Sequence, residues 1–191
     1  YAVAVFARRP EIFDGEAAEI IAAGTTVCQT LESLAQSADL LILNVIATED
    51  VDALCLGQAG LFAHARRGTI VMDHSTIDPE RTMQLALIAQ QGGLEFVDAP
   101  VSGGVWAAEA GTLLTLLGGS ETAVSAVLPV LSQYTKHQQH IGPAGHGQIA
   151  KLCNQIAQVV TIQGIAESIH FARALGGDPD RVLHAIVDGM G

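Results

Sequence analysis

Short apolar runs alternate along this chain with longer segments in which apolar residues recur at helical spacing. Strands are predicted at 2–6, 40–43, 69–73, 95–98 and 113–117, and helices at 14–23, 31–36 and 79–91. Asp78 is the expected N-cap of the last helix, because Pro79 follows it at a favoured first helical position. This alternation is typical of a parallel sheet wrapped by helices. The pattern predicts an α/β fold with a doubly wound, Rossmann-like parallel sheet.

The pattern changes after Gly142. Between 148 and 175 the chain has no proline and one glycine, Gly164, which predicts a single long helix ending at Gly176 and Gly177. A second helix is predicted over 178–187. We therefore expect an α/β domain at 1–142 and the start of an all-α domain at 143–191.

Composition and charge exclude several classes of protein. Hydrophobic residues make up 49% of the chain and charged residues 15%, which excludes a disordered chain. The net charge of −11 argues against nucleic acid as a partner. The longest apolar run, 38–46, is too short to cross a bilayer. Three widely spaced cysteines fit reduced thiols without metal-binding spacing. The chain opens in a strand-like run without a charged leader, so we expect a cytoplasmic protein and the middle part of a longer one.

A phosphate-binding glycine motif is not found near the start. Neither Gly103-Gly104 nor Gly118-Gly119 has the G-x-G-x-x-G spacing of a dinucleotide fold. In such a fold, 1–6 would be the second strand, with the first βα unit missing. Residues after that strand contact the adenosine ribose, where an acidic residue favours NAD and arginine accommodates a 2′-phosphate. Arg8 and Arg9 therefore favour NADP, with NAD still possible and two solvated surface arginines as the alternative.

The first of two informative motifs is D-A-P-V-S-G-G at 98–104. It reads as a strand that ends in Ser-Gly-Gly, where glycine lets backbone N–H groups approach a ligand closely. A helix starting at Gly104 would direct its positive end at a carboxylate. A tight strand-to-helix turn without a ligand is the alternative. Trp106 follows, either lining a pocket or packing its own helix.

The second motif, at 145–155, places Lys151 in the first turns of the long helix. Asn154 and Gln155 follow at i+3 and i+4, near the same face. The positive end of a helix disfavours an ammonium group, which helps to make Lys151 an acid or base near neutrality. Asn154 could bind a substrate hydroxyl. Alone, the motif would be explained better by an exposed lysine on a helix, the usual place of lysines.

Together, D-A-P-V-S-G-G and the later G-x-G-x-x-x-K-x-x-N resemble the β-hydroxyacid dehydrogenase family. This family includes 3-hydroxyisobutyrate dehydrogenase, tartronate semialdehyde reductase and, more distantly, 6-phosphogluconate dehydrogenase. The segment from Asp73 to Pro79 also resembles the family's cofactor-side motif. The resemblance covers nearly the whole chain. It implies a dinucleotide-binding domain at 1–142 and the beginning of a helical substrate and dimerisation domain at 143–191.

The resemblance also implies roles for individual residues. On the substrate side, Lys151 would be the catalytic acid–base, Ser102, Gly103 and Gly104 would hold the substrate carboxylate, and Asn154 would bridge to the substrate.

On the cofactor side, Val45 and Ile46 stand where the family usually has Leu-Pro packing on the nicotinamide. This departure implies that the backbone contact is kept but weaker. Thr76 matches a cofactor-contacting position. Gln155 stands where many members have a second asparagine.

The predicted function is hydride transfer between NAD(P) and a small β-hydroxyacid or its semialdehyde. Alternatives are an imine reductase, a dehydrogenase of phosphorylated sugar acids, or a non-catalytic oligomerising module, against which Lys151 and Asn154 argue. The long helix carries apolar residues on more than one face, which predicts a homodimer or homotetramer. The alternative is that further helices of the same chain cover it.

Overall fold

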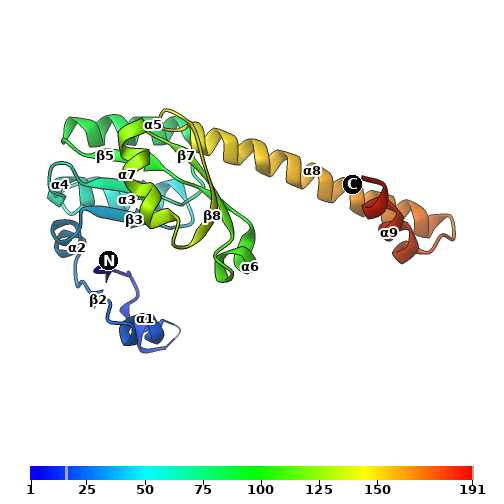
Figure 1. The fold of residues 1–191 in the computed structure, drawn as a ribbon, viewed down its shortest axis with the longest axis horizontal. Coiled ribbons are helices and arrows are strands. Elements are labelled where there is room, and N and C mark those ends of the chain that lie inside the picture. Colours follow the sequence, from blue (N-terminus) through cyan, green and yellow to red (C-terminus); the bar gives the residue numbers. More distant parts are fainter. Residues whose placement is uncertain (16, 191) are drawn as a thin grey trace. The chain divides into compact units, whose positions relative to one another are not determined.

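The structure, a computed structural model, describes residues 1–15 and 17–190. It describes the side chains of all these residues except Met190. They form two compact units, Tyr1–Lys151 and Leu152–Gly191, and Gly191 lies outside the described residues. Helix α8 (His146–Ala174) is continuous through the division between the units (Figure 1). The division falls after the first turns of α8, whereas the predicted boundary lies at the turn before it.

The sheet of the first unit is built on three parallel strands, β3 (Leu40–Leu43), β4 (Ile70–Asp73) and β5 (Glu95–Asp98). Strand β7 (Leu113–Gly118) runs antiparallel to β5 and to β6 (Val101–Ser102). Strand β8 (Thr135–Gly142) lies parallel to β7. The sheet is therefore mixed, with the carboxyl ends of β3, β4 and β5 at one edge.

Both faces of this sheet are buried, because neighbouring residues of β4 and β5 enter different cores. Val71 and Phe96 belong to a cluster with residues of α2 (Leu31–Ser37), α3 (Thr48–Cys55), α4 (Leu61–His64) and α5 (Pro79–Gln91). Met72 and Val97 belong to a second cluster, which includes the buried face of α7 (Glu121–Leu131). Helices on both faces confirm the doubly wound α/β fold.

The start of the chain forms a separate, two-stranded parallel sheet of β1 (Ala4–Val5) and β2 (Thr26–Val27). A 3-10 helix, η1 (Pro10–Asp14), and α1 (Ala18–Ala22) connect these strands. The helix predicted at 14–23 is thus shorter and begins later, because Pro10 starts an earlier turn that ends at Gly15; Glu16 lies outside the described residues. Within the described residues, no pairing joins β1 to β3.

The second unit consists of the remainder of α8 and of α9 (Pro179–Met190). Gly176 adopts the left-handed conformation (φ +78°) that ends α8, and the Gly177 N–H donates to the Ala172 carbonyl at 2.8 Å. Both predicted helices are confirmed. Among the described residues, no helix has the length and apolar character needed to span a bilayer.

Candidate active site

Asp98, at the end of β5, holds the beginning of α8 in place. Its side chain is fully buried, and its two carboxylate oxygens accept hydrogen bonds from the backbone N–H groups of Gly145 (2.7 Å) and Gln148 (2.9 Å). The first N–H groups of a helix have no partner within the helix, and a carboxylate is favoured there. Asp98 therefore caps α8 from a distant strand and connects the two sequence motifs.

Two glycines leave room for this carboxylate. A Cβ atom at Gly118 would lie 2.4 Å from Asp98 Oδ1, and one at Gly147 would lie 2.7 Å from Oδ2 and 2.5 Å from the Leu116 carbonyl oxygen. A side chain at Gly118 would displace the Asp98 carboxylate, and a side chain at Gly147 would also collide with the backbone at Leu116. The second glycine of the G-x-G motif is thus explained by contact with Asp98.

Lys151 lies in α8 one turn after Gln148, and only 7% of its surface is exposed. In the part of the chain that the structure describes, no carboxylate forms an ion pair with its ammonium group. Burial lowers the pKa of Lys151. The expected lowering is therefore present, and desolvation by burial is its cause.

The side chain of Gln148 connects α8 to the loop after β4. It is fully buried; its Nε2 donates to the Ser75 carbonyl at 2.7 Å, and its Oε1 accepts from the Ile77 N–H at 3.2 Å. The Ser75 hydroxyl in turn accepts from the Val45 N–H at 2.9 Å. The loops after β3 and β4, both predicted to contact the cofactor, are thus joined to the helix that carries Lys151.

His74, the first residue of the loop after β4, fixes that loop to the neighbouring part of the domain. Its Nδ1 lies 2.6 Å from the Ala99 carbonyl, so Nδ1 carries the proton, and Nε2 accepts from the Tyr134 hydroxyl at 2.7 Å. Burial lowers the pKa of His74, which keeps the ring neutral. His74 is a structural residue of this edge.

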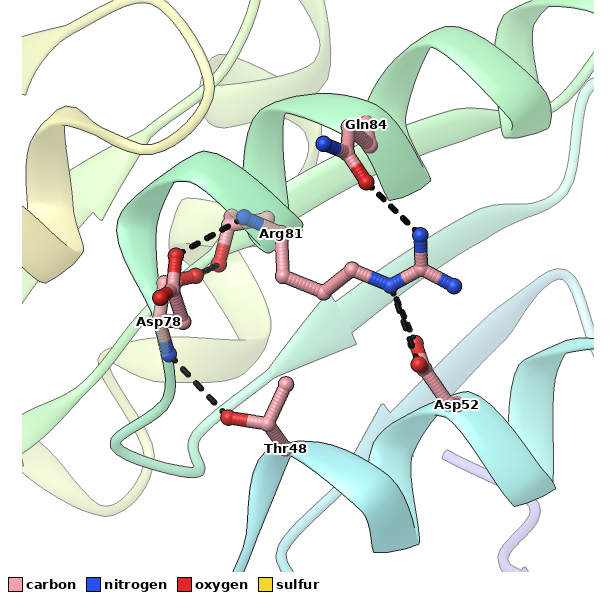
Figure 2. A network of polar contacts seen from close by, with 6 residues as sticks. Thr48, Asp52, Asp78, Arg81 and Gln84 are labelled. Carbon is pink, nitrogen blue, oxygen red and sulfur yellow. Dashed lines mark hydrogen bonds and ion pairs between the residues drawn. The ribbon is translucent and has the colours of Figure 1, made fainter.

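Helix α5 fixes the far end of the loop, as Figure 2 shows. The Asp78 carboxylate accepts from the Arg81 N–H at 3.0 Å, which confirms the predicted N-cap, and the Asp78 N–H donates to the Thr48 hydroxyl of α3 at 3.2 Å. Arg81 also donates from Nε to the Asp52 carboxylate at 2.8 Å and from Nη1 to Gln84. Helices α3 and α5 are therefore connected by a hydrogen bond and an ion pair beside the loop.

Three predicted cofactor residues stand at this edge. Val45 is half-buried and packs on the core, whereas 93% of the Ile46 surface is exposed. Thr76 is exposed between the buried residues Ser75 and Ile77. Exposed side chains on a fixed backbone suit ligand contact.

The two predicted phosphate-binding arginines lie at the turn after β1. Both are exposed, and Arg8 Nη1 forms an ion pair with Asp50 of α3 at 3.2 Å. Such exposed pairs contribute little, roughly 0–1 kcal/mol, so a phosphate could replace Asp50 as the partner.

The predicted carboxylate-binding segment follows β5. Ser102 ends β6, and Gly103 (φ +131°) and Gly104 (φ +69°) both have backbone conformations that favour glycine. A Cβ at Gly103 would lie 2.5 Å from that of Ala107. Helix α6 (Gly104–Glu109) begins where predicted, but it is short, so the predicted carboxylate binding would depend on backbone N–H groups and not on a helix macrodipole. Trp106 is 84% exposed, which excludes packing within its own helix.

Asn154, the remaining predicted substrate residue, lies in α8 within the second unit and is exposed. Among the described residues, no cluster of histidine, cysteine and acidic side chains has the arrangement of a metal site. Sequence reasoning missed the roles of Asp98 and Gln148. For Asp98, its place at the head of the first motif was a signal that could have found it.

Asp73 is a second buried carboxylate, paired in register with Asp98 on the neighbouring strand. Its Oδ1 accepts from the Ser75 N–H at 2.9 Å, and its Oδ2 has no hydrogen-bond partner among the described residues. Burial raises the pKa of Asp73 to about 6, from a usual value of 3.8. Ionising Asp73 therefore costs folding free energy.

A family model described as the NAD binding domain of 6-phosphogluconate dehydrogenase matches residues 1–142. An uncharacterized oxidoreductase of Bacillus subtilis, YkwC, is 35% identical over 98% of the chain and 64% of its own length. The 2-hydroxy-3-oxopropionate reductase of Escherichia coli is 31% identical over 90% of the chain and 59% of its own length. That enzyme is also called tartronate semialdehyde reductase.

Among solved structures, the 3-hydroxyisobutyrate dehydrogenase of Mycobacterium tuberculosis with L-serine has a TM-score of 0.88 and 32% identity, covering 99% of the chain and 62% of that protein. The chain thus spans less than two thirds of the length of each of these relatives.

We predict that the free energy of unfolding of Asp73→Asn, relative to that of the wild type, is higher above pH 6 than at pH 4. The wild-type carboxyl is protonated in both folded and unfolded states below pH 3.8, and its burial penalty develops as the pH rises to about 6. This rise in the pKa of Asp73 corresponds to roughly 3 kcal/mol of folding free energy. Urea unfolding of both proteins from pH 4 to pH 8 measures this difference, with Asp39→Asn, at an exposed carboxylate, as the control. A difference that does not change with pH would contradict the prediction.

Proposed function

Because the chain belongs to the β-hydroxyacid dehydrogenase family, with its 6-phosphogluconate dehydrogenase type of NAD binding domain, we propose that the protein is an NAD(P)-dependent 3-hydroxyacid dehydrogenase. It transfers a hydride between the nicotinamide and a small β-hydroxyacid or the corresponding semialdehyde. One observation carries this proposal: Lys151 is buried without an ion-pair partner among the described residues, on a helix fixed to the loop after β4.

The carboxyl edge of the sheet suits a nicotinamide dinucleotide. Ligands of open α/β sheets bind at this edge. The exposed Ile46 offers an apolar surface for a flat ring, Thr76 offers a hydroxyl beside it, and Arg8 and Arg9 offer positive charge for phosphate. When bound, the dinucleotide accepts or supplies the hydride.

Lys151 is the proposed proton-transfer residue. In oxidation, the neutral amine accepts the proton of the substrate hydroxyl as the C–H bond gives up its hydride and the C=O bond forms. In reduction, the ammonium donates a proton to the developing alkoxide. The lowered pKa of Lys151 brings the two protonation states closer together in population near neutral pH. Asn154 is proposed to bind the same hydroxyl.

The proposed substrate is a small carboxylate. Backbone N–H groups at Ser102, Gly103 and Gly104 would bind its carboxyl group, since glycine allows the backbone to approach closely. The relatives named for 3-hydroxyisobutyrate and 2-hydroxy-3-oxopropionate act on compounds of this kind. With a net charge of −11, we propose no nucleic acid partner, and we propose the cytoplasm as the location.

We further propose that 1–142 is the dinucleotide-binding domain and that 143–191 begins a helical substrate and dimerisation domain. In this arrangement, a further βα unit with a glycine-rich phosphate loop would pair between β1 and β3. In support, β1 and β3 are unpaired with each other in the described residues, and Ile42 of β3 is 44% exposed.

We propose a homodimer or homotetramer because of the exposed apolar surface of the second unit. Its α8 segment exposes Ile156, Val159, Val160 and Ile162 by 59–66%. A helix that is apolar on several sides must be covered in a stable protein. We propose that helices of a second subunit cover it.

We predict that Lys151→Ala and Lys151→Arg in the full-length protein each lower kcat by about 10²-fold or more, the usual contribution of a positioned acid–base. Arginine keeps the charge but cannot release its proton. Steady-state kinetics measure kcat, and fluorescence titration should show unchanged cofactor affinity. Lys136→Ala, at the exposed lysine of β8, is the matched control. Near-normal kcat in Lys151→Arg would show that only the charge matters.

We predict that the full-length protein prefers NADP(H) to NAD(H), measured by kcat/KM. Arg8→Asp should shift this ratio toward NAD by roughly tenfold or more, because it removes a charge-assisted contact and adds repulsion. Asp50→Asn should shift it the other way, because Arg8 loses its competing ion-pair partner. A wild-type preference for NAD would refute this assignment.

We predict that the full-length protein sediments as a dimer or tetramer at micromolar concentration. Ile156→Glu combined with Val160→Glu should yield monomers, since charge cannot be buried in an apolar interface. Gln158→Glu, which adds a single charge at a position between them that is already polar, should leave the assembly intact. A monomeric wild-type protein would instead indicate that helices of the same chain cover this surface.

A further inference from the structure

The side-chain amide of Gln148 makes the two backbone hydrogen bonds to the loop at Thr76 that a neighbouring parallel strand would make. It donates to the carbonyl of Ser75 and accepts from the N–H of Ile77, the residues on either side of Thr76. A parallel strand pairs in the same way, with the groups on either side of one residue. The backbone at Thr76 is therefore held, while its side chain stays exposed.

The backbone of Gln148 is fixed independently of its side chain. Its N–H donates to Asp98 at 2.9 Å, and the Gly145 N–H donates to the same carboxylate. Asp98 thus fixes the helix to β5, and the amide fixes the loop after β4 to the helix. Lys151 follows one turn later, and residues three apart are neighbours on a helix surface.

We propose that Gln148 is a positioning residue, which holds the cofactor-side loop Ser75–Ile77 and the helix that carries Lys151 in one fixed relation. The effect on kinetics rests on the proposed function, whereas the structural role of Gln148 does not. Hydride and proton must reach the same carbon–oxygen unit, so the two groups that deliver them need a fixed separation. Neither Gln148 itself nor its amide contacts the reacting atoms in this proposal.

A side-chain amide donates and accepts hydrogen bonds at the same time, at any pH near neutrality. In Gln148→Met, the volume is kept and both hydrogen bonds are lost. In Gln148→Glu, the ionised carboxylate still accepts from Ile77 but repels the Ser75 carbonyl. Once protonated, the same side chain donates again, so low pH should restore the bridge.

The first measurement is hydrogen exchange in the cofactor-free, full-length protein, which does not depend on activity. The Ile77 amide should exchange at least about tenfold faster in Gln148→Met than in the wild type, because its acceptor is gone. In Gln148→Met, peptides from β3 and β4 themselves should stay protected. Gln91→Met, the same substitution at an exposed position of α5, should change nothing.

The second measurement is the isotope effect with cofactor deuterated at the transferred position. Gln148→Met should lower kcat about 10-fold or more and raise the deuterium isotope effect on kcat, because a misaligned hydride step becomes rate-limiting. A role in folding alone would reduce the active fraction and leave the isotope effect unchanged. The kcat of Gln148→Glu, divided by that of the wild type at each pH, should rise as the pH falls. Dividing by the wild type removes the part of the pH dependence that Asp73, Asp98 and Lys151 contribute equally in both proteins.

Unchanged exchange at Ile77 in Gln148→Met overturns the proposal, whatever Lys151→Arg shows. Faster exchange with an unchanged isotope effect overturns its kinetic part. If Gln148→Met does not fold, Gln148→Glu decides, and a ratio independent of pH counts against the bridge. Conversely, normal kcat in Lys151→Arg with faster exchange in Gln148→Met would refute the acid–base role and leave the bridge in place.

Discussion

The buried carboxylate of Asp98 is the contact on which the arrangement of this site depends. It satisfies the unpaired N–H groups at the start of α8 from a strand about fifty positions earlier in the chain. Without it, buried donors would lose their acceptor, at a cost of about 1–3 kcal/mol each. Gly118 and Gly147 follow from the same contact, because a side chain at either would collide with the carboxylate. One interaction therefore accounts for several residues of two separate motifs.

Asp98 also changes how the environment of Lys151 is understood. The positive end of a helix would disfavour an ammonium group nearby, but here a carboxylate already binds the amides that produce it. What remains is desolvation, which acts on Lys151 because it is 7% exposed and has no ion-pair partner among the described residues. The pKa of Lys151 is thus set by packing, so substitutions that loosen the start of α8 should affect it.

Much of the fold could be predicted from local pattern. The strands at 40–43 and 95–98 and the helix at 79–91 have the predicted bounds, because hydrophobic runs and an Asp-Pro cap are local signals. Helix α7 was missed, since Pro129 and an almost wholly apolar sequence hide its period. For the site, motif resemblance supplied Lys151 and Ser102. The role of Gln148 could not be predicted, because its partners lie 71 and 73 residues away.

The burial of α8 suggests how chemistry and specificity are divided. Lys151 and everything that anchors it belong to the first unit, and from Leu152 onward most residues of the helix are exposed. Relatives named for different substrates match 90% and 99% of the chain, at 31% and 32% identity. In the proposed function, one acid–base site would serve all of them, because every β-hydroxyacid presents the same carbon–oxygen unit and carboxylate. The distal end of the substrate differs, so discrimination should come from whatever covers the exposed face of α8 in the complete protein.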